Sequence, residues 1–469
     1  MINFTATYTD QYQLAMAQVY FKSSQKADRA VFDYFFRKLP FQGGYAIFAG
    51  LDHLLEILED LRFSNEDLEF LKKQHFDRDF IAFLKDFRFR GKIRSVKEGD
   101  VVFPNRPVLQ VEANIIEAQL VETIILNLLN FQTLIATKAS RINLVARGNL
   151  LIDFGLRRAQ GPGGYLASRA AVIGGVSATS NVVAGKDFDI SVSGTMAHSF
   201  IQSFDDELTA FKCFAQERPQ DCVLLVDTYN TLESGMPNAI AVAKEMEERG
   251  DKLMAVRLDS GDLAYLAKKT RRLLDDAGLD YVKIAASNQL DEYVIKSILE
   301  QEGPIDIFGV GTNLVTGGPD GALDGVYKLA WSGGKPRIKI SESITKTTLP
   351  HRKQVFRIKD SHGKCIGADA IGLYNETHID TMYHPFEITK KMVLKGFEQE
   401  PLMETVMENG KKLIAKQSLT KIAEYSKQRL SELPIEYKRF DNPHLYKIGI
   451  SEALRNERDK LIRESKRSL

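Results

Sequence analysis

Apolar residues gather into six short runs in the middle of the chain, and each run ends in glycine or polar residues. The runs follow one another at intervals of 24 to 38 residues. Between the later runs, residues 237–249 and 262–277 carry apolar side chains at helical spacing, and Gly250 and Gly278 follow as stop signals. Six strands alternating with helices predict a parallel sheet, and favour a closed or nearly closed α/β barrel over an open sheet. The runs begin near Leu150, Phe188, Val223, Leu253, Tyr281 and Ile305.

The segments on either side show no repeated strand–helix unit. Before the runs, the patterns predict helices at 9–21, within 51–87 and at 115–145, a strand at 31–36 and a compact β region at 91–113. After Tyr327 the runs VYKLAW, RIKIS and VFRI predict strands, and charged helices follow from about Lys416. We therefore predict an N-terminal α+β supporting domain, an α/β barrel catalytic domain and a C-terminal β and helical extension. Their predicted bounds are 1–149, 150–340 and 341–469.

Composition narrows the possible partners. The chain has 63 Lys and Arg against 62 Asp and Glu, so no excess of charge points to nucleic acid or to an anionic membrane. Its start lacks the basic and apolar parts of a signal peptide, and polar residues interrupt the most apolar helical segment, 120–136. Three cysteines without a CxxC motif suit a reducing compartment. We expect a cytoplasmic protein without a disulfide framework, whose anion sites are local.

The stretch Asp189–Phe200, DISVSGTMAHSF, reads as a strand that turns into a helix. Such a turn surrounds one point with backbone N–H groups, and here also with hydroxyls and the imidazole of His198. The unpaired donors and the helix dipole together favour a bound phosphate or carboxylate. The alternative is structural: Ser193 or Thr195 caps the helix, and His198 packs in its first turn.

Polar and glycine residues follow the end of each predicted strand. In α/β folds such residues converge on one site, and these supply arginine forks, carboxylates that could hold Mg²⁺ and glycine turns. The set predicts a site for a polyanionic small molecule, although any one aspartate could instead cap a helix. No GxxxxGK[ST], strand-linked GxGxxG, HExxH or zinc spacing occurs. The strand-end residues are Asp153, Arg157, Arg158, Thr195, His198, Asp227, Tyr229, Arg257, Asp259, Asp262, Ser287, Asn288, Gly309, Gly311, Thr312 and Asn313.

Several motifs together resemble the nicotinate phosphoribosyltransferase family. The resemblance covers about Thr9 to Ile358, and the last hundred residues add little. It implies a type II phosphoribosyltransferase with an irregular α/β barrel and an N-terminal sandwich-like domain, in a head-to-tail homodimer with shared sites. The motifs, in order, are TDQYQ, DFGLRRAQGPGG, VSGTMAHSF, VDTYNTLESGMPNA, VRLDSGDL and GVGTNLVTG.

The resemblance also implies a reaction in NAD biosynthesis. Nicotinate and 5-phosphoribosyl diphosphate would form nicotinate mononucleotide and diphosphate, with ATP hydrolysed through a phosphohistidine and Mg²⁺ as cofactor. This makes the predicted enzyme a ligase-type glycosyltransferase, and no protein group is assigned as a direct metal ligand.

The resemblance assigns roles to eight residues. His198 matches the phosphohistidine, and an imidazole nitrogen is a suitable phosphoryl acceptor near neutral pH. The nicotinate contacts match Tyr12, reaching over from the partner subunit, together with Thr195 and Arg257, whose planar guanidinium suits a carboxylate. The phosphoribosyl diphosphate contacts match Arg157, Asp259, Gly311 and Thr312. No general base is needed, because the nicotinate nitrogen carries its own lone pair.

Three alternatives are weighed against this prediction. Nicotinamide phosphoribosyltransferase carries an aspartate after its GT pair, where this chain has Met196. Leaving the amide N–H unpaired there would cost about 1–3 kcal/mol, so nicotinate is favoured. Quinolinate phosphoribosyltransferase would need more cationic contacts and is a shorter chain. A barrel that only binds a phosphorylated metabolite would not need a phosphoryl acceptor such as His198.

Overall fold

The structure, a computed structural model, describes residues 4–342, 346–387 and 389–467. Its internal contacts divide the chain into two compact units. The first comprises Met1–Leu134, Ala322–Gln417 and Glu424–Leu469, and the second Ile135–Gly321 with Ser418–Ala423. The predicted division into 1–149, 150–340 and 341–469 differs, because strands from both ends of the chain share one sheet in the first unit.

Six parallel strands form the sheet of the second unit, in the order β7-β6-β11-β10-β9-β8. One apolar residue from each strand is buried in a single cluster, which runs from Ala178 of β7 to Val223 of β8. The α/β architecture is confirmed, and closure of the sheet into a barrel stays a prediction. The strands span Leu150–Asp153 (β6), Ala178–Thr179 (β7), Val223–Leu225 (β8), Ala255–Leu258 (β9), Lys283–Ser287 (β10) and Ile307–Val310 (β11).

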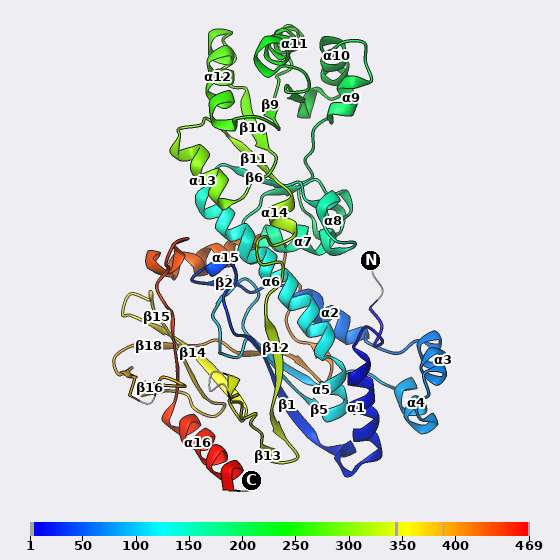
Figure 1. Cartoon of the computed structure of the whole chain (residues 1–469), viewed down its shortest axis with the longest axis vertical. Helices are drawn as coiled ribbons and strands as arrows, with labels where there is room; N and C mark the ends of the chain where they lie inside the picture. Colours follow the sequence, from blue (N-terminus) through cyan, green and yellow to red (C-terminus); the bar gives the residue numbers. More distant parts are fainter. Residues whose placement is uncertain (1–3, 343–345, 388, 468–469) are drawn as a thin grey trace. The chain divides into compact units, whose positions relative to one another are not determined.

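Helices connect these strands and flank the sheet (Figure 1). The predicted helices at 237–249 and 262–277 are confirmed as α11 and α12. Asp262 caps α12 by accepting from the Tyr265 N–H at 3.0 Å, and Gly278, at φ 70°, follows the helix as predicted. The helices span Gly163–Ile173 (α7), Val182–Phe188 (α8), His198–Gln202 (α9), Glu207–Glu217 (α10), Met236–Glu248 (α11), Leu263–Asp276 (α12), Glu292–Glu300 (α13) and Thr312–Val315 (α14).

The strand predicted near Phe188 is wrong. Phe188 ends helix α8, where its ring packs on that of Tyr165 at 4.6 Å, and Asp189 then turns the chain in the left-handed region at φ 56°. Beyond it, an isolated parallel bridge joins Val192 to Thr179 in place of the predicted strand. The apolar alternation did not distinguish the end of a short helix from a strand.

The first unit contains two larger sheets and a two-stranded one. The first larger sheet is antiparallel, in the order β13-β12-β1-β5-β3-β19-β20, and Figure 1 shows β12 alongside β1. The second has the order β17-β16-β21-β15-β14-β18, and β2 pairs with β4. The strands span Arg29–Phe36 (β1), Ala46–Ile47 (β2), Lys92–Ser95 (β3), Val101–Val102 (β4), Leu109–Asn114 (β5), Gly325–Ser332 (β12), Lys335–Pro336 (β13), Lys353–Lys359 (β14), Cys365–Leu373 (β15), Thr381–Tyr383 (β16), Lys391–Val393 (β17), Glu398–Pro401 (β18), Glu404–Glu408 (β19), Lys411–Lys412 (β20) and Lys447–Ile450 (β21).

Most predictions for these flanking segments are confirmed. The run RIKIS is an exception: residues 337–341 lie outside any strand, because the hairpin between β12 and β13 pairs Trp331 and Ser332 with Pro336 and Lys335 and ends there. The last two residues of the predicted C-terminal helix lie outside the described part. The helices span Gln11–Lys22 (α1), Leu51–Asp60 (α2), Asn65–Lys73 (α3), Arg78–Lys85 (α4), Ile115–Leu120 (α5), Glu122–Val145 (α6), Leu419–Glu432 (α15) and Glu452–Arg467 (α16).

A buried ion-pair network stabilises the first unit. Asp100 Oδ1 accepts from Arg357 Nη1 at 2.7 Å and from Arg429 Nε at 3.1 Å, and Arg357 Nε also donates to Asp369 at 3.2 Å. Burial raises the pKa of Asp100, but the two arginines outweigh burial and lower this pKa to about 2. The ionised carboxylate therefore stabilises the folded unit.

Candidate functional site

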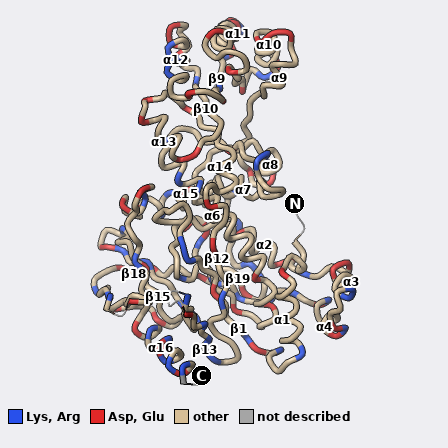
Figure 2. The backbone as a smooth tube through the Cα atoms, viewed as in Figure 1, with Lys and Arg blue, Asp and Glu red and all other residues tan. Residues whose placement is uncertain are grey.

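The candidate site is a cavity of about 510 Å³ in the second unit. It opens where β6, β8 and β9 end, and the segment before α9 forms part of its wall. Figure 2 shows Lys and Arg interspersed with Asp and Glu along the backbone. The charged groups of the cavity itself are Arg157, Arg257 and Asp259. Five of the eight predicted site residues line it: Arg157, Thr195, His198, Arg257 and Asp259.

Arg257 is the most constrained of these side chains, with 12% of its surface exposed. Its Nη1 donates to Thr195 Oγ1 and, at 3.3 Å, to the carbonyl oxygen of Met196. Its Nε donates to Ser287 Oγ at 2.9 Å, and its Nη2 lies 3.2 Å from Asp259 Oδ1. Since a guanidinium has five N–H donors, these four interactions leave one donor for a ligand.

Asp259 connects Arg257 to His198. Its Oδ1 faces Arg257 and accepts from Ser287 Oγ, whereas its Oδ2 lies 3.8 Å from His198 Nε2. On the other edge of the imidazole, Nδ1 lies 3.0 Å from Thr228 Oγ1. The hydroxyl and the carboxylate thus hold the half-buried ring from both sides.

Helix α9 follows the turn in the predicted stretch and begins at His198, and the alternative in which Ser193 or Thr195 caps it is wrong. Thr195 Oγ1 donates to the Met196 carbonyl oxygen at 3.1 Å, and the N-cap position belongs to Ala197. The turn before α9 is therefore held by Arg257 through Thr195 and Met196. Loss of that arginine would also release the segment that carries His198.

Arg157 lines the cavity from the short helical turn Leu156–Arg158 after β6. Its side chain is exposed, and within the described part of the chain its guanidinium makes no hydrogen bond or ion pair. Asp153 fixes this turn, because its Oδ1 accepts from the Gly155 N–H at 2.8 Å. Arg157 is thus a cation held at the cavity whose donors are open to an anion.

Asp153 itself is structural. It is 1% exposed, and its Oδ2 accepts from Ser168 Oγ at 2.7 Å and Thr179 Oγ1 at 2.8 Å. Burial raises the pKa of Asp153, and these hydrogen bonds only partly offset the effect.

The remaining predicted residues are not brought to the cavity wall. Gly311 and Thr312 lie at the start of α14, after β11, whose Val310 carbonyl oxygen accepts from the Phe154 N–H at 2.8 Å. They are therefore near the Phe154 backbone, although they do not line the cavity. Tyr12 lies on α1 of the first unit and is 50% exposed, so its role stays a prediction.

The structure adds residues that the sequence analysis did not single out. Phe154 lines the cavity, with its ring centroid 5.7 Å from the Arg257 guanidinium carbon, and Thr228 contacts His198. Both directly follow strand-end aspartates, Asp153 and Asp227, so the same strand-end rule could have found them. Ser287 was expected at a strand end, but its bonds to Arg257 and Asp259 depend on the neighbouring strand β9.

The sequence is similar to those of known enzymes along nearly its whole length. Family models match residues 7–130 (nicotinate phosphoribosyltransferase N-terminal domain), 150–365 (nicotinate phosphoribosyltransferase family) and 352–458 (the C-terminal domain of these enzymes). A nicotinate phosphoribosyltransferase of Bacillus subtilis is 44% identical over 98% of this chain and 95% of its own. One from Mycobacterium tuberculosis is 41% identical over 96% and 93%.

The fold agrees with these matches. The crystal structure of human nicotinic acid phosphoribosyltransferase superposes with a TM-score of 0.86 at 30% identity, covering 97% of this chain and 99% of that one. A parallel α/β sheet with a cavity lined by Arg157 and Arg257 at the ends of its strands is typical of an α/β enzyme. The chain belongs to the nicotinate phosphoribosyltransferase family. Within the described ranges, no helix is both long and apolar enough to span a membrane.

Proposed function

We propose that this chain joins nicotinate to 5-phosphoribosyl diphosphate, releasing diphosphate and forming nicotinate mononucleotide for NAD biosynthesis. The observation that carries the proposal is one cavity lined by Arg157, Thr195, His198, Arg257 and Asp259. It lies in a chain that is 44% identical to a nicotinate phosphoribosyltransferase of Bacillus subtilis. The C1′–N bond forms as the C1′–O bond to diphosphate breaks. The protein must orient the two substrates, stabilise the departing charge and exclude water.

Nicotinate binding is assigned to Arg257 and Thr195. One guanidinium N–H remains unoccupied, so a two-pronged contact needs a second donor, and the Thr195 hydroxyl beside it can supply this by leaving the Met196 carbonyl. Met196 is 5% exposed and lines the same cavity, and its thioether accepts only weakly from an amide NH₂. The donors of Arg257 and Thr195, together with the weak acceptor Met196, therefore favour nicotinate over nicotinamide.

The phosphoribosyl diphosphate is assigned to Arg157, Asp259, Gly311 and Thr312. Arg157 supplies a guanidinium that no described residue pairs with, and Gly311 and Thr312 supply backbone and hydroxyl donors beside Phe154. Asp259 suits the ribose, because a carboxylate accepts from hydroxyls.

The residues present fit Mg²⁺ as the cofactor. Within the described ranges no group of three His, Cys, Asp or Glu side chains could hold a metal ion alone. Asp227 Oδ1, however, is buried and has no hydrogen-bond partner among the described residues, while Oδ2 accepts from the Asp259 N–H at 2.9 Å. Magnesium is often held by one or two carboxylates plus substrate phosphates, a role that Asp227 and Asp259 can fill. The ion would neutralise charge on the diphosphate.

The coupling to ATP, which makes the reaction ligase-type, is assigned to His198. A ring nitrogen would attack the γ-phosphorus, so that an N–P bond forms, the P–O bond to ADP breaks, and water later releases phosphate. Thr228 and Asp259 orient the ring for this transfer.

Labelling and product assays test the proposal. With γ-labelled ATP we expect acid-labile label on the native chain and none on His198→Ala, whereas His362→Ala, at an exposed histidine, should label normally. His198→Ala should lose ATP stimulation but keep slow transfer. Undiminished label in His198→Ala would refute the role of His198. Product assays with nicotinate, nicotinamide and quinolinate, each with and without ATP, test the substrate directly. Product from nicotinamide or quinolinate but not from nicotinate would refute the main proposal.

We also propose a homodimer in which Tyr12 of each subunit completes the partner's site. Tyr12→Ala and Arg257→Ala variants should each be impaired, and mixing them after dissociation should restore activity, because each mixed dimer contains one intact site. No recovery on mixing, with mixed dimers verified, would refute the shared site.

A further inference from the structure

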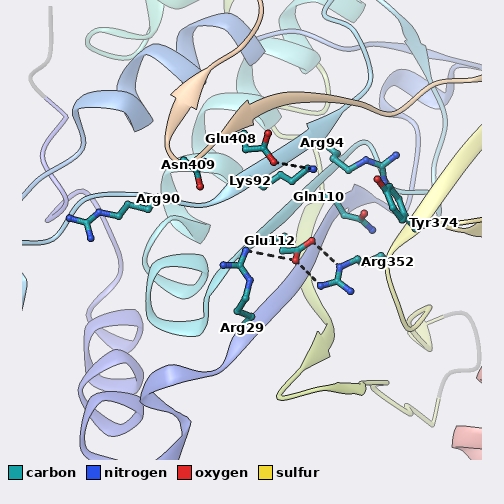
Figure 3. Close-up of a pocket in the computed structure, with 10 residues that line it drawn as sticks. All are labelled: Arg29, Arg90, Lys92, Arg94, Gln110, Glu112, Arg352, Tyr374, Glu408 and Asn409. Atoms are coloured by element: carbon teal, nitrogen blue, oxygen red, sulfur yellow. Dashed lines mark hydrogen bonds and ion pairs between the residues drawn. The ribbon is translucent and has the colours of Figure 1, made fainter.

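A second charged cavity, of about 390 Å³, lies in the first unit (Figure 3). Strands β1, β3 and β5 of the seven-stranded sheet contribute to its lining, together with the end of β19 and the segments next to β14 and β15. Its volume is within the range of about 300–1,000 Å³ that is typical of small-molecule sites. Its charged side chains are Arg29, Arg90, Lys92, Arg94, Arg352, Glu112 and Glu408.

The two carboxylates balance only part of this positive charge. Arg352 grips Glu112 with two hydrogen bonds, of 2.8 and 2.6 Å, and Arg29 lies 3.7 Å from the same carboxylate. Glu408 faces Lys92 at 3.4 Å. Five cations and two anions leave the cavity with an excess of three positive charges.

Arg94 is the buried cation of this set, and its hydrogen bonds go to neutral groups. It is 8% exposed, and it donates to the carbonyl oxygens of Lys353 at 2.8 Å and Met403 at 3.0 Å. Its guanidinium carbon lies 4.5 Å from the Tyr374 ring centroid, and within the described ranges no carboxylate is within ion-pair distance of it. Burial of this cation lowers its pKa. A buried charge that only neutral groups satisfy is costly, and a bound anion would compensate it.

We propose that this cavity binds a small phosphorylated anion, a phosphate ester or a polyphosphate carrying at least two negative charges. Arg94 and Arg352 present planar donor sets to such a ligand and Lys92 a point charge, while Arg90, at the edge in Figure 3, adds long-range attraction. The site lies in a different compact unit from the cavity on the parallel sheet. Its occupancy therefore does not depend on the proposed reaction.

Calorimetric titration of the full chain with inorganic tripolyphosphate tests the proposal. We expect two classes of binding site in the native chain, one of them on the parallel sheet. The double variant Arg90→Gln/Lys92→Gln should raise the Kd of the class in the first unit by about tenfold or more. Arg157→Ala should raise the Kd of the class on the parallel sheet. The matched control is Lys97→Gln, since Lys97 faces Glu404 at 3.4 Å, as Lys92 faces Glu408, but lies outside the cavity.

Each outcome decides the proposal. Native binding by Lys97→Gln, loss of one class in the double variant and unchanged nicotinate turnover support it. Two unchanged classes in the double variant, or equal losses in the control, overturn it. Citrate serves as a competing arm: if citrate occupies the site and tripolyphosphate does not, the phosphate assignment is wrong. Unaltered melting temperatures exclude misfolding, and a Lys92→Gln single variant replaces the double one if that chain fails to fold.

Discussion

Replacing Arg257 with lysine probes the centre of the candidate site. The native guanidinium makes four polar interactions in different directions, with Thr195, Met196, Ser287 and Asp259. Lysine carries three donors on a single nitrogen, so it cannot reach both the segment before α9 and the end of β10. We expect at least two of the four interactions to be lost.

The magnitude follows from the charge and burial of this side chain. A hydrogen bond to a charged group contributes about 1.5–3 kcal/mol, so two lost bonds amount to about 3–6 kcal/mol before water replaces part of them. Only 12% of the side chain is exposed, so water recovers a minor share. A net loss of about 2–4 kcal/mol corresponds to a fall of about 30- to 1,000-fold in kcat/KM for nicotinate.

Initial rates of nicotinate mononucleotide formation measure this effect, with nicotinate varied at saturating 5-phosphoribosyl diphosphate. The KM for nicotinate should rise most, because Arg257 and Thr195 are the assigned carboxylate contacts. Arg272→Lys, at an exposed arginine of α12, is the matched control and should behave as the native chain. A folded Arg257→Lys chain with native kcat/KM for nicotinate would refute the assignment.

Three further predictions follow from the contacts. Ser287→Ala leaves Arg257 Nε without its acceptor and should lower kcat/KM for nicotinate about 5- to 100-fold, while Ser297→Ala, on an exposed face of α13, should not. Gly309→Ala places a Cβ against the Phe154 ring, so it should raise the nicotinate KM and cost about 1–3 kcal/mol of stability, measured by urea denaturation. Asp100→Asn leaves Arg429 and Arg357 without this partner and should cost about 3 kcal/mol, since Arg357 keeps Asp369.

The contribution of Asp100 to the free energy of unfolding also depends on pH. The folded pKa, about 2, lies below the ordinary 3.8, so ionised Asp100 stabilises the fold fully above about pH 5. About 2–3 kcal/mol of that stability is lost as the pH falls from about 5 to about 1, and Asp100→Asn should lack this component. Parallel acid-denaturation curves for the two chains would contradict this. Native turnover of nicotinate in Ser287→Ala would contradict the prediction for that variant. An unchanged urea midpoint and nicotinate KM in Gly309→Ala would contradict the prediction for Gly309.

Local pattern determined much of the second unit. Apolar runs separated by amphipathic segments predict strands and crossover helices, because burial of one face depends on residues near in sequence. That reasoning located β6 and β8–β11, as well as α11 and α12. Of the sixteen strand-end residues, five line one cavity, and the family resemblance assigns roles to the same five. It failed at Phe188, because a short apolar run is compatible with both a strand and the end of a helix.

Tertiary structure decided what depends on distant partners. Strand pairing is non-local, so the sequence did not show that β12 joins β1, and the predicted division differs from the two units. It also could not show that Asp153 is buried and saturated by hydrogen bonds, whereas Arg157, four residues later, has no partner among the residues that the structure describes. The identity of a side chain sets which bonds it can make. Only the packing of neighbouring strands decides whether its donors and acceptors bond within the protein or remain available to a ligand.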